Sequence, residues 1–421
     1  MRKVIQIEER PPLGQAIPLS LQHLFAMFGA SVLVPTLFHI NPAVVLLMNG
    51  VGTLIFIFIT KGKAPAFLGS SFAFIAPVLL VTGSLGYRYA LGGFVASGLI
   101  FCVFAGIIYF FGVKWVDIVL PPAAMGPVVA LIGLELAGTA ASTGGMLPAD
   151  GAAVDPKAAA VFIITLAVAV FGSLLFRKFL SVIPILIAII VGYLFAWAFG
   201  IVDFSTFEGV PLFALPNFQA PLFNMGAVGI IIPATLVVLS EHIGHQLVTS
   251  KVVGRDLIKD PGLHRTLLSD GVSTMLSGLT GAVPTTTYGE NIGVMAITKV
   301  YSVWVIGGAA VLSVIIAFIG VVSAAIMTIP GPVMGGVSML LYGMIASSGI
   351  RLLVEAKVDY SRAKNLALTS VVFVVGLSGM SVSFGAVQLK GMALATIVGM
   401  LLSLVFYMLE KYRLTNDQEQ E

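Results

Sequence analysis

Long apolar stretches alternate with short breaks of Gly, Pro and charged residues along the whole chain. A membrane-spanning helix needs about 20 mostly apolar residues, so each such stretch predicts one span. The pattern predicts fourteen spans, at 15–36, 41–60, 66–83, 89–112, 119–140, 158–176, 180–200, 225–248, 266–282, 286–298, 302–320, 330–350, 366–385 and 391–410. Two of these spans, 66–83 and 286–298, are short and interrupted by small or polar residues. The pattern therefore predicts an all-α polytopic membrane protein.

The composition leads to the same class. Of the 421 residues, 58% are hydrophobic and 10% are charged, whereas a soluble domain carries about 25% charged residues. The first 14 residues are polar and lack an apolar core, so we expect no cleavable signal peptide. The formal net charge of +3 is small and gives no reason to expect a nucleic-acid partner.

Several kinds of chemistry find no support in the sequence. The single cysteine, Cys102, excludes an intrachain disulfide and offers no metal-ligand spacing. The Ser and Thr residues lack the context of a nucleophile elbow, and no Walker A motif occurs. We therefore expect a protein that is not an enzyme, that has no cofactor or metal, and that draws energy from an ion gradient or the substrate's own gradient.

The distribution of basic residues predicts the orientation. When the N-terminus is placed in the cytoplasm, all but three of the 22 Lys and Arg residues fall on cytoplasmic segments; the exceptions are Arg88, Lys157 and Lys390. Removing or adding one span would destroy this asymmetry in the rest of the chain. We therefore predict fourteen spans in the inner membrane, with both termini on the cytoplasmic side.

Weak similarities between the two halves of the chain predict an internal repeat. PPAAMGPVVALIG (121–133) aligns with PGPVMGGVSMLLY (330–342), and Gln22-His23 occupies the place of Glu241-His242. The two short spans also lie at equivalent places in the two halves. Because each half would hold seven spans, an odd number, the halves would be inverted. Chance similarity between Gly- and Leu-rich segments is the alternative.

Short spans at matching places in two inverted halves point to the substrate site of a transporter. The first holds LGSSFAF (68–74) and the second holds TYGENIG (287–293). Backbone that leaves the helix inside a membrane must line a cavity or a ligand. If each break exposes the start of a half-helix, free N–H groups and a partial positive charge face that cavity.

Acidic residues inside the bilayer are costly, so each of them needs a partner or a function. Glu241 lies deep in the eighth span, and His245 follows four residues later on the same helix face. A buried acid near an imidazole can hold or pass a proton, so this pair is the candidate for proton coupling. The alternative is a satisfied Glu–His pair that joins two helices. His242 faces another direction and has a structural interpretation.

The other polar residues of the spans divide into candidates and supports. Glu290 would either accept hydrogen bonds from a substrate or cap the helix that follows, and Asn291 would cap that helix or bond to a facing one. Asp270 would orient partners in the eighth or tenth span, or be purely structural. Tyr342 would reach the site from a facing domain or lie at the membrane interface. Packing or an interface is the more natural role of Glu135, and Gln22 and His23 would join helices.

Residues 290–299, ENIGVMAITK, resemble the signature of the nucleobase–ascorbate transporter family, in which an acid, Gln or Pro precedes Asn-x-Gly-x-x-x-x-Thr. The similarity covers essentially the whole chain and is greatest to bacterial members that carry uracil. It includes ERPPLGQAIPLSLQHLFAMFGA (9–30), LGSSFAF, PPAAMG, LSEHIGH, TYGENIG, PGPVMGGVS and LKGMALATIVG (389–399).

The resemblance implies a fold of seven plus seven inverted spans, with a short extended strand in each of the broken spans. It implies a core domain at 1–115 and 223–321 and a gate domain at 116–222 and 322–421, the last including a cytoplasmic tail. It also implies a homodimer formed through the gate domain. The family moves nucleobases across the lipid bilayer, in bacteria mostly with protons.

The resemblance also assigns roles to residues. Glu241 and Glu290 would bind a pyrimidine, and the backbone N–H groups of Phe72 and Gly289 would meet its carbonyl oxygens. Tyr288 and Tyr342 would line the site, and Glu241 and His245 would couple transport to the proton. Four further residues would support the site: Ala30, Ser71, Asn291 and Asp270.

Uracil matches this set, because its two N–H groups suit two carboxylates and its two carbonyl oxygens suit two sets of amides. Buried acids would repel an anion such as ascorbate or sulfate, and the central parts of the third, eighth and tenth spans hold no Lys or Arg. Asp270 resembles an acid of purine-carrying relatives. The expected function is proton-coupled uracil import, and proton-coupled transport of xanthine or uric acid is the alternative.

Overall fold

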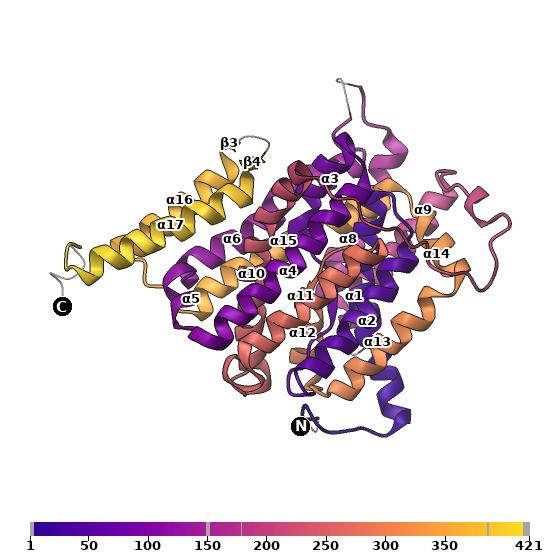
Figure 1. Ribbon diagram of the computed structural model, residues 1–421. Helices are drawn as coiled ribbons and strands as arrows, with labels where there is room; N and C mark the ends of the chain where they lie inside the picture. Colours follow the sequence, from indigo (N-terminus) through magenta and orange to yellow (C-terminus); the bar gives the residue numbers. More distant parts are fainter. Residues whose placement is uncertain (1–3, 149–151, 178, 385–386, 416–421) are drawn as a thin grey trace.

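The computed structural model describes residues 4–148, 152–177, 179–384 and 387–415 as a bundle of tilted helices (Figure 1). The first half contains α1 (Leu13–Phe38), α2 (Pro42–Ile59), β1 (Leu68–Ser70), η1 (Phe72–Phe74), α3 (Ile75–Ser84), α4 (Tyr87–Phe111), α5 (Lys114–Val119), α6 (Pro122–Glu135), α7 (Ala137–Thr143), α8 (Pro156–Leu175) and α9 (Pro184–Ala198). The second half contains α10 (Met225–Val253), α11 (Leu263–Thr280), β2 (Thr285–Thr287), α12 (Gly289–Thr298), α13 (Val303–Ala317), α14 (Gly320–Met327), α15 (Gly331–Glu355), α16 (Ala363–Leu377), β3 (Ser381–Phe384), β4 (Val387–Lys390) and α17 (Gly391–Lys411). Each of the fourteen predicted spans overlaps a helix of the structure, and the span at 119–140 takes in α6 and the start of α7.

Eight helices of the described chain are long and apolar enough to cross a membrane, and four shorter apolar helices accompany them. The two remaining predicted spans, α11 and α12, are in neither group. Ten residues are too few for α12 to cross, and α11 carries Ser, Thr and Asp side chains that are buried against its neighbours. The chain is a multi-pass membrane protein in which the most polar spans bury most of their Ser, Thr, Asp and Asn side chains against other helices.

Local sequence sets the start of several helices. α2 begins after Asn41, whose side-chain oxygen accepts a hydrogen bond from the backbone N–H of Ala43 at 2.8 Å. Asp155 caps α8 and Asn224 caps α10 in the same way. Such caps satisfy backbone N–H groups that a helix leaves free in its first turn. Pro at the first helical position, as in α2 and α8, fixes a backbone angle that already suits a helix.

The predicted span at 366–385 is wrong at its C-terminal end. α16 ends at Leu377, and β3 and β4 form an antiparallel hairpin before α17 begins; residue 385 lies outside the described residues. Gly379 has φ +73°, which stops the helix, and the segments SVSF and VQLK then alternate polar and apolar residues with the period of a strand. The short helices α5 and α14 were also not predicted.

Packing between helices follows the inverted repeat. α4 packs on α11, and the pair at equivalent places in the repeat, α13 on α2, packs likewise. The same correspondence relates α1–α13 to α10–α4, α8–α9 to α16–α17, and α8–α15 to α16–α6. A two-fold relation between two halves of seven spans gives equivalent helices equivalent neighbours, as observed here. The fold is therefore fourteen spans arranged as seven plus seven inverted.

The predicted repeat motifs lie on two helices that pack against each other. α6 holds the first copy and α15 the second. At their crossing the backbones approach closely, because a Cβ added to Gly133 would lie 2.0 Å from the carbonyl oxygen of Tyr342 and one added to Gly349 would lie 2.4 Å from the nitrogen of Ala130. Glycine at these positions permits a contact that any side chain would block.

The two broken spans meet at β1 and β2. The strands pair antiparallel, with Leu68 opposite Thr287 and Ser70 opposite Thr285. Threonine side chains of neighbouring helices form hydrogen bonds with backbone groups that the strand pairing leaves without a partner. Thr53 accepts from the N–H of Leu68 at 2.9 Å, and Thr274 donates to the carbonyl of Thr285 at 3.0 Å. Non-helical backbone deep in the bundle is therefore tolerated, as membranes require.

Candidate functional site

A cavity of about 390 Å³ lies beside the β1–β2 crossing, within the usual size range of small-ligand sites. α10, α12 and the two strands form one wall, and α9 and α15 form the other. Its lining includes Ser70, Phe72, Glu241, His245, Thr286, Tyr288, Gly289, Glu290 and Arg351, together with apolar residues of α1, α9 and α15. Most of the site residues predicted from the sequence thus lie around one cavity.

Glu241 and His245 line the cavity from one face of α10. Glu241 is 6% exposed, and its Oε2 has no hydrogen-bond partner in the part of the chain that the structure describes. His245 Nδ1 lies 3.2 Å from the hydroxyl of Thr287 in β2. The helix spacing brings both side chains to the cavity, but His245 bonds to Thr287 rather than to Glu241. A buried oxygen without a partner favours a ligand or proton at that place.

Two helix starts point at the cavity. α12 begins at Gly289, with Tyr288 alone between it and β2, and η1 begins at Phe72, with Ser71 alone between it and β1. Gly289, Glu290 and Phe72 all line the cavity. The first turn of a helix has backbone N–H groups without partners inside the helix, and it carries a partial positive charge. Together these starts offer two sets of donors to the oxygen atoms of a ligand.

Tyr288 and Ser70 form the wall where the strands meet. The Tyr288 hydroxyl donates to the carbonyl of Ser70 at 3.2 Å, and a Cβ added to Gly69 would lie 2.2 Å from the Tyr288 ring. The ring therefore needs a glycine beneath it. Ser70 lines the cavity, whereas Ser71 does not. The buried Ser71 hydroxyl has no hydrogen-bond partner among the described residues.

Tyr342 lies one layer behind the cavity. Its ring packs edge-on against Phe72, with the ring centroids 5.9 Å apart, and it is not among the lining residues of the cavity. The side chain is 2% exposed. The contact with Phe72 places Tyr342 between α15 and the first broken span.

Buried polar side chains hold the walls of the site in place. His242 Nδ1 lies 2.8 Å from Asp270 Oδ2, and the hydroxyl of Thr286 donates to the same oxygen at 3.1 Å. Asp270 thus connects α10 to β2 from behind the cavity. Asn291 donates to the ring nitrogen of His23 at 3.0 Å and to the carbonyl of His23 at 3.1 Å, which ties α12 to α1. Ala30 is buried in α1.

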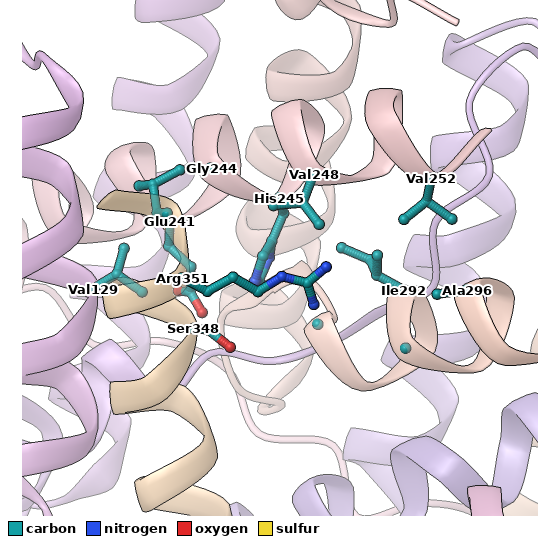
Figure 2. Close-up of a pocket in the computed structure, with 13 residues that line it drawn as sticks. Val129, Glu241, Gly244, His245, Val248, Val252, Ile292, Ala296, Ser348 and Arg351 are labelled. Atoms are coloured by element: carbon teal, nitrogen blue, oxygen red, sulfur yellow. The ribbon is translucent and has the colours of Figure 1, made fainter. Parts of the chain in front are cut away.

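Arg351 is a lining residue that the sequence did not single out. It lies in the last turns of α15, and a second cavity of about 90 Å³ joins it to Glu241, His245 and the last turns of α10 and α12 (Figure 2). Its Nε donates to Glu355 at 2.5 Å. In the sequence, Arg351 looks like any basic residue at the cytoplasmic end of a span. Only the packing of α15 beside α10 shows that it lines the cavity.

Comparison with known proteins identifies the family of the chain. The sequence model of the Permease family matches residues 14–385. The uracil permease of Escherichia coli strain K12 is 58% identical over 412 residues, which cover 98% of this chain and 96% of that protein. The uracil permease of Paenibacillus larvae is 56% identical over 418 residues and 99% of each chain.

Among solved structures, the transmembrane domain of the cyanobacterial bicarbonate transporter BicA matches with a TM-score of 0.66. The match covers 96% of this chain and 99% of that chain at 14% identity, so it concerns the fold alone. The family match over most of the chain and the high identity to the two permeases decide membership. This chain belongs to the permease family of the nucleobase–ascorbate transporters, whose signature its residues 290–299 resemble.

Proposed function

We propose that this chain imports uracil together with protons across the inner membrane. The observation that carries the proposal is the meeting of Glu241, Glu290 and two half-helix starts around one cavity. The two relatives described above are both uracil permeases, which supports the choice of substrate.

The chemistry of uracil fits the four groups that face the cavity. The ring N–H groups would donate to the carbonyl oxygen of the protonated Glu241 and to the carboxylate of Glu290. The carbonyl oxygens of uracil would accept from the backbone N–H groups of Phe72 and Gly289. A site built to pair polar ligand atoms rejects analogues that leave those groups unpaired. Asp270, which raised the purine alternative, bonds to His242 and Thr286 and is not among the cavity residues.

Proton coupling would reside on Glu241, with His245 beside it on the same face of α10. A carboxylate buried without a partner is costly when charged, so binding a proton or a donor from the substrate stabilises it. Loading the proton would prepare the site for a neutral base. Release of both to the cytoplasm would follow, because the two cavities extend from Glu241 towards the ends of α10, α12 and α15.

The cavity lies between elements of the two predicted domains, since α10 and α12 belong to 223–321 and α15 belongs to 322–421. Movement of the core, 1–115 and 223–321, against the gate, 116–222 and 322–421, would expose the site to each side in turn. We place both termini in the cytoplasm because of the positive-inside pattern, and we propose a homodimer formed through the gate.

Uptake of labelled uracil into proteoliposomes, with and without an inward proton gradient, tests the proposal. Uptake that does not depend on the gradient would contradict the coupling. Glu241→Gln should abolish accumulation, because an amide cannot take up the proton; accumulation equal to that of the wild type would exclude Glu241 as the coupling group. Competition by xanthine and uric acid in the same assay distinguishes the purine alternative.

A further inference from the structure

The segment before α1 runs along the end of the bundle where α12 finishes. Residues 4–12, here called the arm, lie beside residues 299–303, which join α12 to α13 (Figure 1). The N–H of Ile5 donates to the carbonyl of Lys299 at 3.0 Å, and the N–H of Tyr301 donates to the carbonyl of Ile5 at 2.9 Å. The N–H of Val303 continues the pairing with the carbonyl of Ile7 at 2.9 Å. The arm is thus hydrogen-bonded to the residues directly after α12.

Side chains fasten the arm at several further points. Ile7 is 0% exposed, and Glu8 accepts two hydrogen bonds from Arg255, at 2.5 and 3.0 Å. The Arg10 guanidinium lies 4.8 Å from the centre of the Trp304 ring. Exposed ion pairs contribute little, so the backbone hydrogen bonds and the burial of Ile7 carry most of the attachment.

α12 needs support at its ends. It has ten residues, about 15 Å in length, and a helix this short is marginal in isolation. One of its faces, with Gly289, Gly293 and Ile297, lines the cavity rather than packing on other helices. Its first residue follows β2, and Asn291 bonds to α1. The arm holds the other end, where Lys299 ends the helix at φ 61°.

We propose that the arm is a positioning element of the substrate site. α12 is a short rod, so fixing the residues after Thr298 also fixes Gly289 and Glu290 at its opposite end. Loosening the arm would let α12 tilt or shift and would misplace the amide and carboxylate that meet the base. This inference rests on the proposed uracil site, and its experiment separates the two.

The test uses full-length protein in nanodiscs and the variants Ile7→Ala and Ile7→Val. The matched controls are Ile108→Ala and Ile108→Val, in which an equally buried isoleucine of α4 is shortened. The measurements are uracil affinity by calorimetry, uptake KM and kcat in proteoliposomes, the melting temperature, and hydrogen exchange of the α12 amides. Ile7→Ala should raise Kd and KM at least tenfold and speed exchange in α12. Ile7→Val should raise both constants about threefold.

The controls should lower the melting temperature without changing Kd by more than twofold. If Ile7→Ala lowers the melting temperature as Ile108→Ala does while Kd and α12 exchange stay at wild-type values, the arm only stabilises the fold and the inference is wrong. If Ile7→Ala fails to fold, an unchanged Kd of Ile7→Val contradicts the inference equally. A wild-type protein that does not bind uracil contradicts the proposed function, and the exchange comparison still decides the role of the arm.

Discussion

In the first broken span, β1 leads through η1 into α3; in the second, β2 leads directly into α12. Both place a helix start beside the cavity, and the strands pair with each other. The first contributes Ser70 and the backbone at Phe72, whereas the second contributes Tyr288 and Glu290. One backbone arrangement thus occurs twice, but the ionisable chemistry of the pair lies on one copy. The backbone shared by the two spans therefore forms the cavity, and we expect the side chains of the second span to determine which ligand it binds.

The largest effect is expected where the two spans touch. Gly69→Ala should destabilise the protein by about 1–3 kcal/mol and abolish measurable uracil binding, because the new methyl group would overlap the Tyr288 ring. Gly106→Ala in α4 is the control, since an added Cβ there has no neighbour within 4 Å and Gly106 is not among the lining residues of the cavity. It should keep or raise the melting temperature, because alanine favours a helix by about 0.5–1 kcal/mol. Equal melting temperatures and affinities for the two variants would contradict the close contact between the spans.

A smaller effect is expected from the side chains that differ. Glu290→Gln should weaken uracil binding about 10- to 100-fold, since a hydrogen bond to a charged group is worth about 1.5–3 kcal/mol. Ser70→Ala, at the comparable place in the first broken span, should weaken it by less than about fivefold. Calorimetric titration of both variants with uracil measures the difference. Similar losses for the two would show that the two spans share recognition equally.

The sequence was sufficient to predict the features that depend on composition and local pattern. Apolar runs predicted the fourteen spans, and small and polar residues at 68–74 and 287–293 predicted the breaks. Helix periodicity predicted that Glu241 and His245 share a face. The alternation in SVSF and VQLK is typical of strands. Because SVSF directly follows a long apolar run, the apolar pattern extends the predicted helix into it.

Contacts between distant segments could not be predicted in the same way. The hydrogen bond of His245 to Thr287 depends on how far β2 lies from α10, and no periodicity encodes that distance. Arg351 has the sequence environment of any residue at the end of a span, and only the packing of α15 places it in the cavity. The arm has the sequence of a polar leader, and its pairing partner lies almost 300 residues away.

The smallest effect concerns two exposed ion pairs outside the spans, one linked to each broken span. Lys63, shortly before β1, lies 2.8 Å from Asp260, and Glu8 of the arm lies 2.5 Å from Arg255. The hydrogen bond from Arg255 lowers the pKa of Glu8 below its ordinary value of 4.5. A lowered carboxyl pKa contributes stability that is present above the ordinary value and is lost as the pH falls through the lowered one.

Glu8→Gln should therefore lower the free energy of unfolding at pH 7 by less than about 1 kcal/mol, because both side chains are largely exposed. The difference from the wild type should shrink as the pH falls below 4.5. Melting curves of nanodisc samples between pH 7 and about pH 3 measure it, with Lys63→Gln as the matched loss of the other pair. A difference that stays constant over this range would mean that the Glu8 carboxylate does not stabilise the folded arm through its charge. The arm would then be held at this end of the second broken span by backbone pairing, by the burial of Ile7 and by the contact of Arg10 with Trp304.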